Sequence, residues 1–502
     1  METLLLDGES LTCRALAAAA ATARPAVGLD GPARERLAAA RAVVTRALAS
    51  GEAVYGLNTG LGARATQRLS AEELAAFSLQ TLRGRALSLG APLPAEVVRA
   101  AMIVRLNTLG RGAAGCDPAV AAFLETCLAR GLTPLVREGG SIGASDLLLG
   151  ATLGLALVGE GELVDSTGRV GPAAEVLRAA GLAPLALGPR DGLALANHSS
   201  FSGALAALFV ARAETALTAV QQAAALSMEG FRANLSPLDP AALALRPQPG
   251  QAQAAEGLRR LLAGGGLEAP GAARRLQDPL SFRTLPQTHG AGFAALETAR
   301  AAAEAEINGA SDNPAVLLGE GRVVSNGAFQ TPWLTLAAET LSRALAQVAV
   351  LLVARCSKLL AERFTGLPLF LARPGADSNG FAPVMKLAEA LLAEVLLAAQ
   401  PVAIWPSVNA DGVEDALTNA PLAARQGLRL LAAFERLVAI EAVIAAQAVE
   451  LRGCATTLSP ALGEVLARVR RHSPALAEDR PLAAEIEALS AAIRGGALAA
   501  PA

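Results

Sequence analysis

The sequence predicts a mainly α-helical protein, with an elongated central bundle of long helices and a smaller, loop-rich N-terminal domain. Three observations lead to this fold class. Alanine and leucine dominate a chain of 502 residues, of which 53% are hydrophobic and only 3% are aromatic. Strands prefer β-branched and aromatic residues, so this composition favours helices. Long stretches repeat apolar residues at helical spacing, and glycine-rich loops separate them.

The helical stretches can be placed in order along the chain. Apolar residues recur at helical spacing over 34–50, 70–89, 94–109, 118–130, 147–161, 201–229, 292–308, 334–362, 382–399 and 420–451. Polar segments that contain glycine predict small hairpins at 162–170 and within 308–329. The proline-rich stretch 236–290 is interpreted as irregular connection between helices.

We expect three domains from this pattern. Residues 1–200 form an N-terminal domain that carries two glycine-rich loops. Residues 201–450 form the central bundle, because long helices joined by loops are typical of bundles. Residues 451–502 form short C-terminal helices.

Charge and hydropathy argue against several kinds of partner. The formal net charge is −2, which predicts no long-range attraction to nucleic acid or to an anionic membrane. Polar residues interrupt the apolar stretches before they reach the roughly 20 residues of a membrane span. The first ten residues lack a signal-peptide pattern, and five scattered cysteines are typical of a reducing compartment. We therefore expect a cytoplasmic protein without a metal site, since its three histidines lie far apart.

The chain has a single tyrosine, Tyr55, in the glycine-rich loop 51–65 (GEAVYGLNTGLGARA). An isolated tyrosine most often packs a loop against the core. Glycines, however, let the backbone approach a ligand and let a loop move. No strand–turn–helix unit surrounds the loop, which disfavours a dinucleotide site. Tyr55 is therefore a candidate functional residue.

A second glycine-rich loop, GGSIGASD at 139–146, precedes an apolar helix. One interpretation is a tight turn in which Ser145 or Asp146 caps the helix that follows.

These two loops resemble those of the aromatic amino acid ammonia-lyases, the family of histidine, phenylalanine and tyrosine ammonia-lyases. VYGLNTGLG is similar to the tyrosine loop of that family, and GSIGAS followed by DL is similar to its GSVGASGDL segment. Further similar segments follow in the same order: RLNTLGRGAAG, QDPLSFRTLPQTHGA, EINGASDNPAV, SNGAFQ and GVEDALTN. The resemblance covers about residues 50–420 and implies a fumarase/aspartase-like helical architecture, a homotetramer and an amino acid substrate.

The resemblance also implies the chemistry. In the family, an Ala-Ser-Gly tripeptide cyclises into the electrophile methylidene-imidazolone (MIO), and no dissociable cofactor is needed. A base then removes a β-proton of the substrate, and ammonia leaves. Ala144 and Ser145 match the first two residues of the tripeptide. The family's glycine is missing after Ser145, so either Asp146 takes the third place or the chain has lost or changed this chemistry.

Other roles carry over by position within the similar segments. Tyr55 matches the base, Asn197 an asparagine near the electrophile, and Arg283 the arginine that binds the substrate carboxylate. The pocket-lining positions correspond to Gln277 and Phe329. Leu280 stands where the family usually has tyrosine.

Two charged residues bear on the choice of substrate. Glu414 matches a glutamate of histidine lyases, whereas Arg85 lies at or near the position that selects the substrate. Arg85 points to an anionic or strongly hydrogen-bonding substrate side chain.

The sequence thus predicts a carbon–nitrogen lyase that is similar to histidine ammonia-lyase and has an altered pocket. The reaction would convert an α-amino acid into an α,β-unsaturated acid. Two alternatives stay open: an aminomutase of the same family, and a catalytically silent helical homologue without MIO.

Overall fold

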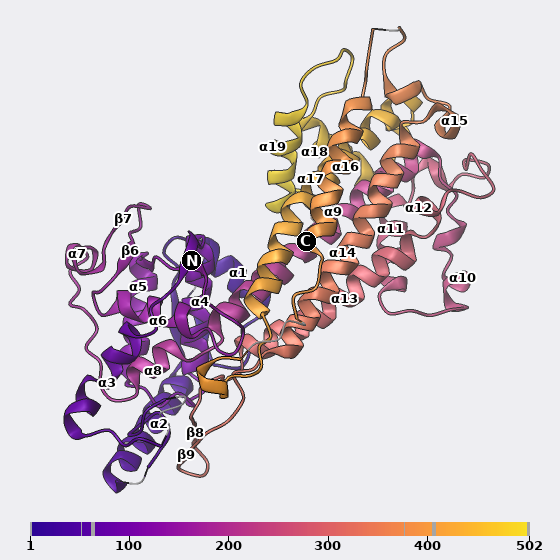
Figure 1. Ribbon diagram of the computed structural model, residues 1–502. Coiled ribbons are helices and arrows are strands. Elements are labelled where there is room, and N and C mark those ends of the chain that lie inside the picture. The colour runs from indigo at the N-terminus through magenta and orange to yellow at the C-terminus, as the bar shows by residue number, and fades with distance from the viewer. Residues whose placement is uncertain (1–2, 52, 62–65, 376, 404–407, 499–502) are drawn as a thin grey trace. The chain divides into compact units, whose positions relative to one another are not determined.

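The computed structural model describes the chain except for residues 1–2, 52, 62–65, 376, 404–407 and 499–502. The described chain is mainly helical, which confirms the predicted fold class (Figure 1). Its longest helices are α9 (Ser200–Phe231), α13 (Leu285–Ile307), α14 (Pro332–Leu359) and α17 (Ala420–Arg452). The predicted ranges for α9, α14 and α17 lie within three residues of these bounds, because their apolar residues keep helical spacing throughout. Helix α13 begins seven residues before its predicted start at 292.

The chain divides into two compact units, each assembled from three separate stretches. Unit 1 comprises Met1–Ala211, Ala299–Ala338 and Pro401–Arg425. Unit 2 comprises Arg212–Thr298, Glu339–Gln400 and Gln426–Ala502.

Unit 1 holds shorter helices and small sheets in addition to the ends of long helices. Its helices are α1 (Cys13–Ala21), α2 (Gly31–Ser50), α3 (Ala71–Arg83), α4 (Ala95–Leu109), α5 (Pro118–Arg130), α6 (Leu147–Leu157), α7 (Ala173–Ala179) and α8 (Asp191–Ala196). Its strands are β1 (Leu4–Leu6), β2 (Val27–Leu29), β3 (Leu89–Pro92), β4 (Thr133–Pro134), β5 (Arg137–Gly139), β6 (Glu162–Val164), β7 (Val170–Pro172), β8 (Ala315–Leu317) and β9 (Arg322–Val324).

The strands pair locally. β1 and β2 are parallel, whereas β3–β5, β4–β6, β6–β7 and β8–β9 are antiparallel. The β6–β7 and β8–β9 hairpins lie in the two segments where the sequence predicts them.

Helix ends in unit 1 follow recognisable capping rules. Ser70 and Glu73 form a capping box at the start of α3, which satisfies two backbone N–H groups that the helix leaves free. Asp30 caps α2, and Gly51 ends it in the left-handed conformation. The loop that carries Tyr55 therefore begins at Gly51 and ends where α3 begins.

Close packing around α8 brings the two candidate loops together. α8 contacts both α3 and α6. A Cβ at Gly192 of α8 would lie 2.0 Å from the carbonyl oxygen of Ser78 on α3, so only glycine permits this approach.

The other helices of unit 2 are α10 (Pro240–Ala244), α11 (Gln251–Leu262), α12 (Leu280–Arg283), α15 (Glu362–Thr365), α16 (Ala382–Ala398), α18 (Pro460–His472) and α19 (Ala483–Arg494). The interpretation of 236–290 as irregular was wrong for α10, for α12, for the start of α13 and, over the longest range, for α11. Nearby prolines obscured its helical spacing, but Ala254, Leu258 and Leu262 share its buried face.

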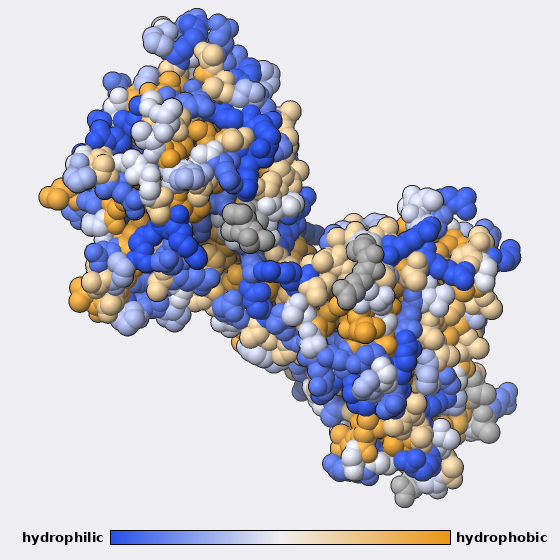
Figure 2. Space-filling model, turned by 180° about the vertical axis from the view of Figure 1, so that it is seen from behind, coloured by the Kyte–Doolittle hydropathy of each residue, from blue (hydrophilic) through white to orange (hydrophobic). Residues whose placement is uncertain are grey.

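Two described segments, Asp191–Phe231 and Pro332–Leu359, are long and apolar enough to cross a membrane by length and composition. Within their most apolar windows, 72% and 61% of the residues are buried inside the protein, as in core helices. Apolar residues also lie between hydrophilic ones at the surface (Figure 2). The exposed apolar side chains of the described chain include Leu387, Leu396 and Leu397 on α16 and Val350 on α14.

Candidate active site

A cavity of about 800 Å³ in unit 1 gathers most of the candidate residues. Its walls come from loops that lie far apart in sequence. The described residues that line it are Tyr55, Leu61, Arg85, Ala144, Ser145, Leu147, Leu193, Asn197, Asn313, Ser325, Asn326, Phe329, Gln330, Ala410, Val413, Glu414, Asp415 and Ala416. The cavity thus combines a phenol, hydroxyls, amides, carboxylates and a guanidinium group.

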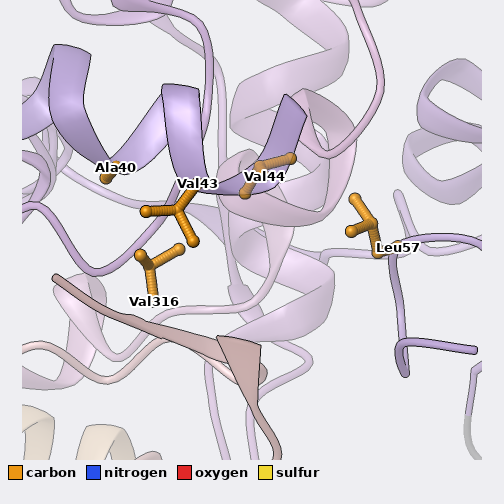
Figure 3. Close-up of a cluster of buried hydrophobic side chains, with 5 residues drawn as sticks. All are labelled: Ala40, Val43, Val44, Leu57 and Val316. Carbon is orange, nitrogen blue, oxygen red and sulfur yellow. The ribbon is translucent and has the colours of Figure 1, made fainter. Parts of the chain in front are cut away.

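The tyrosine loop is fixed directly after Tyr55. Gly56 adopts φ +62°, and a Cβ there would lie 2.8 Å from Cδ2 of Leu193, so glycine is required. Leu57 is buried in an apolar cluster with Val44 of α2 and Val316 of β8 (Figure 3). This packing holds the backbone next to Tyr55 and lets its side chain line the cavity.

The second loop places Ser145 opposite Asn197. Ser145 has φ +62°, which is unusual for a residue with a Cβ. Its N–H donates to the carbonyl oxygen of Phe329 at 3.2 Å, and its Oγ donates to Oδ1 of Asn197. The amide of Asn197 in turn donates to the carbonyl oxygen of Asn313 at 2.6 Å. Ser145 is therefore held by Phe329 and Asn197, and Asn197 is held in turn by Asn313.

Asp146 begins α6 and is fully buried. Its N–H donates to the carbonyl oxygen of His198 at 2.8 Å. Its carboxylate accepts hydrogen bonds from Oγ of Ser141 at 2.7 Å and from both N–H and Oγ of Ser202 at 2.8 Å each. Burial raises the pKa of Asp146, and these hydrogen bonds oppose the shift. The predicted capping role does not occur, because the side chain makes no hydrogen bond to its own helix.

Arg85 and Glu414 bring opposite charges to the cavity. Arg85 follows the C-terminal end of α3, and its side chain is half-buried. Burial lowers the pKa of Arg85, whereas the charges of Tyr55 and Glu414 raise it. Glu414 lies in a tight turn in which its N–H and carbonyl oxygen both pair with the backbone of Asn409.

Besides the buried Asp146, three predicted residues do not line this cavity. Gln277, Leu280 and Arg283 belong to unit 2 and are not among the residues that line this cavity. Leu280 and Arg283 lie on the short helix α12, where Leu280 is exposed.

Several residues of the site were not singled out from the sequence. Ser141 and Ser202 hold Asp146, and Asn313 holds Asn197. Asn313 lies in EINGASDNPAV, one of the segments that resemble the family. This resemblance was the only sequence signal for Asn313. Leu193 and Ser202 lie in ordinary helical sequence, where no local pattern marks them.

His198, the residue after Asn197, has a structural role. It is fully buried, its Nδ1 accepts from the N–H of Ser200 at 3.2 Å, and its Nε2 lies 3.0 Å from the carbonyl oxygen of Leu195. Burial lowers the pKa of His198 well below its usual value, so the ring is neutral. In the described part of the chain, no three His, Cys, Asp or Glu side chains form a group that would hold a metal ion.

Comparison with known proteins decides the family. The family model for aromatic amino acid lyases matches residues 11–471. This chain belongs to the aromatic amino acid lyase family. The resemblance seen in the sequence is thereby confirmed, and with it membership of an enzyme family of ammonia-lyases. Members of this family carry an autocatalytic MIO group.

Individual relatives cover nearly the whole chain. Histidine ammonia-lyase of Anaeromyxobacter sp. (strain K) is 37% identical over 99% of this chain and all of its own length. Among solved structures, ergothionase of Treponema denticola, an ergothioneine-degrading enzyme, is 28% identical over the full length of both chains with a TM-score of 0.93. Tyrosine aminomutase of Streptomyces globisporus is 28% identical over 99% of this chain and 98% of its own, also with a TM-score of 0.93.

Proposed function

We propose that this chain is a carbon–nitrogen lyase that eliminates ammonia from an α-amino acid to give an α,β-unsaturated acid. One observation carries the proposal: Tyr55 and the Ser145–Asn197 pair line one cavity with both a cation and carboxylates. An elimination of this kind needs a base at the β-carbon and polar groups that orient a zwitterionic substrate. The histidine ammonia-lyase relatives support the same reaction class.

Tyr55 is the proposed base. It is the residue that the similar segment assigns to this role, and its loop is fixed by Gly56 and Leu57. The charge of Arg85 interacts with Tyr55. A guanidinium group next to the phenol stabilises the negative charge that the oxygen carries while it acts as a base.

The substrate pocket is proposed to differ from that of a histidine lyase. Arg85 is well suited to bind an anionic side chain, because its planar guanidinium group donates two parallel hydrogen bonds to a carboxylate. Glu414 supplies the opposite charge for the substrate ammonium group. Phe329 closes the cavity with an apolar surface.

Oligomerisation is part of the proposal. Exposed apolar side chains on α14 and α16 are typical of helices that pack against another subunit. We expect a cytoplasmic homotetramer in which Gln277, Leu280 and Arg283 contribute to substrate binding as the resemblance implies.

An aminomutase is the second candidate, since the tyrosine aminomutase structure is as similar in fold as any described above. The two reactions differ only in whether ammonia is added back at the β-carbon, so their products distinguish them.

The proposal is tested by incubating the purified protein with a panel of α-amino acids. Ammonia is measured together with the organic product. We expect ammonia and an unsaturated acid in equal amounts from at least one substrate. A β-amino acid as the main product would identify the aminomutase, and no product from any substrate would contradict both enzymes.

A further inference from the structure

The tripeptide that would form MIO has aspartate in its third place. Ring closure forms a bond between the nitrogen of Asp146 and the carbonyl carbon of Ala144. The first water that leaves is made of the Ala144 oxygen and the amide hydrogens of Asp146 and Ser145. The second water is made of the hydroxyl group and the α-hydrogen of Ser145, and its loss creates the methylidene group. The completed ring therefore has no N–H at either position.

Both of these N–H groups have hydrogen-bond partners in the structure. The Asp146 N–H donates to the carbonyl oxygen of His198 at 2.8 Å, and the Ser145 N–H donates to that of Phe329 at 3.2 Å. Ring closure would leave each of these carbonyl groups without its donor. A buried polar group that loses its partner is costly.

The side chain of Asp146 adds a second obstacle. Its carboxylate accepts three hydrogen bonds from Ser141 and Ser202, and it is fully buried. These contacts fix the side chain at the start of α6, and the hydrogen bond to His198 holds its nitrogen in place, so both oppose a turn of the nitrogen towards Ala144. Glycine in this place has neither a Cβ nor such contacts. Asp146 as it is held does not fit the third position of the ring.

We infer that Ala144, Ser145 and Asp146 stay an open peptide, and that the substrate itself must supply the electron-withdrawing group for elimination. The inferred substrates are α-amino acids that carry a carboxylate on the β-carbon, or a similar anionic group that accepts the electron pair. Only the inferred substrate class rests on the proposed lyase activity, because the open peptide follows from the contacts of Ser145 and Asp146.

The chemistry balances without an enzyme-bound electrophile. The Tyr55 oxygen takes the β-proton, and the electron pair of that C–H bond moves into the substrate carboxylate. Arg85 stabilises the resulting dianionic carboxylate. The pair then returns to form the carbon–carbon double bond as the Cα–N bond breaks. Ammonia leaves and takes the proton from Tyr55, so the products are an unsaturated dicarboxylate and ammonium.

The test combines the mass of the protein with its substrate range. Intact and peptide masses are measured for the natural protein and for a variant with one glycine inserted between Ser145 and Asp146. The natural protein is expected to have the full mass of its sequence, and the insertion variant to be lighter by two waters. A natural protein lighter by two waters would overturn the open peptide. An insertion variant of full mass would contradict the role given to Asp146.

Ammonia release from amino dicarboxylic acids is then compared with release from phenylalanine and histidine. We expect at least a tenfold higher kcat/KM for a dicarboxylic substrate in the natural protein. Faster turnover of phenylalanine or histidine by a protein of full mass would overturn the substrate class. Full mass without any turnover would contradict the lyase proposal and leave the open peptide standing.

Discussion

The carboxylate of Asp146 accepts hydrogen bonds from both the N–H and the Oγ of Ser202, 56 residues later in the chain. Both donors are buried, as is the aspartate. The pair connects the start of α6 to the first turn of α9, and it fixes the backbone that leads out of the Ala144–Ser145 segment.

Replacing Asp146 with alanine is expected to destabilise the protein by about 2–3 kcal/mol. The variant leaves the buried donors of Ser202 and the half-buried hydroxyl of Ser141 without their acceptor. Chemical denaturation measures the change. Asp165→Ala is the control, because Asp165 accepts a similar set of hydrogen bonds from Thr167 at an exposed turn. We expect the control to cost less than about 1 kcal/mol, and equal losses for the two variants would contradict this account.

Arg85→Ala is expected to shift substrate preference towards neutral side chains. Loss of a charged hydrogen bond to the substrate predicts a fall in kcat/KM for an anionic substrate of roughly tenfold or more. Steady-state kinetics on one anionic and one neutral substrate measure the ratio. Arg83→Ala is the control, since Arg83 pairs with Glu160 at the surface, 2.9 Å from Nε to Oε2. An unchanged ratio in Arg85→Ala would rule out its role in selectivity.

Titration of Glu306 is expected to lower the free energy of unfolding as the pH rises from about 4.5 to 7. Burial, together with the smaller effect of the nearby charge of Asp146, raises the pKa of Glu306 to about 7, although the hydrogen bond from Ser199 opposes the shift. The folded state thus binds the proton more tightly than the unfolded state, so its advantage is present at low pH and is lost as the pH rises through this window.

Glu306→Gln should therefore flatten the profile of unfolding free energy against pH, by at most about 3 kcal/mol across the window. Glu320→Gln, in the exposed turn of the β8–β9 hairpin, should leave the profile unchanged. A Glu306→Gln profile as steep as that of the natural protein would count against the raised pKa.

The buried ion pair between Arg105 and Asp312 supports the segment that positions Asn313. Its two hydrogen bonds measure 2.8 and 3.2 Å, and both side chains are shielded from solvent. Asp312→Asn leaves the guanidinium charge uncompensated, which predicts a loss of about 3–5 kcal/mol of stability. Denaturant titration tests this value. Asp377→Asn breaks an exposed pair with Arg373 and should change stability by less than about 1 kcal/mol.

Much of the fold could be predicted from local pattern. The range 420–451 predicted for the last long helix differs by one residue from α17, since its apolar spacing is unbroken. Helix α11 was missed because prolines flank a short amphipathic segment. The division into compact units could not be derived, because each unit joins stretches that are far apart in sequence.

The sequence singled out those residues of the cavity that lie in loops similar to those of the family. Tyr55, Arg85, Ser145, Asn197, Phe329 and Glu414 line one cavity, as expected of an active site. The contacts of Asp146 with Ser202 were not predictable, because a serine at the start of a long helix carries no signal of a tertiary hydrogen bond. Nor could the sequence show that Leu193 packs on Gly56.

The central claim is that Tyr55 removes the proton in an ammonia-forming elimination. The most direct measurement compares the initial rate of ammonia release by the natural protein and by Tyr55→Phe on the best substrate, with circular dichroism and oligomeric mass as checks on folding. The account predicts a loss of about 100-fold or more, since a positioned base contributes on that order, with the fold and assembly unchanged. A folded Tyr55→Phe protein that releases ammonia at nearly the natural rate would contradict it.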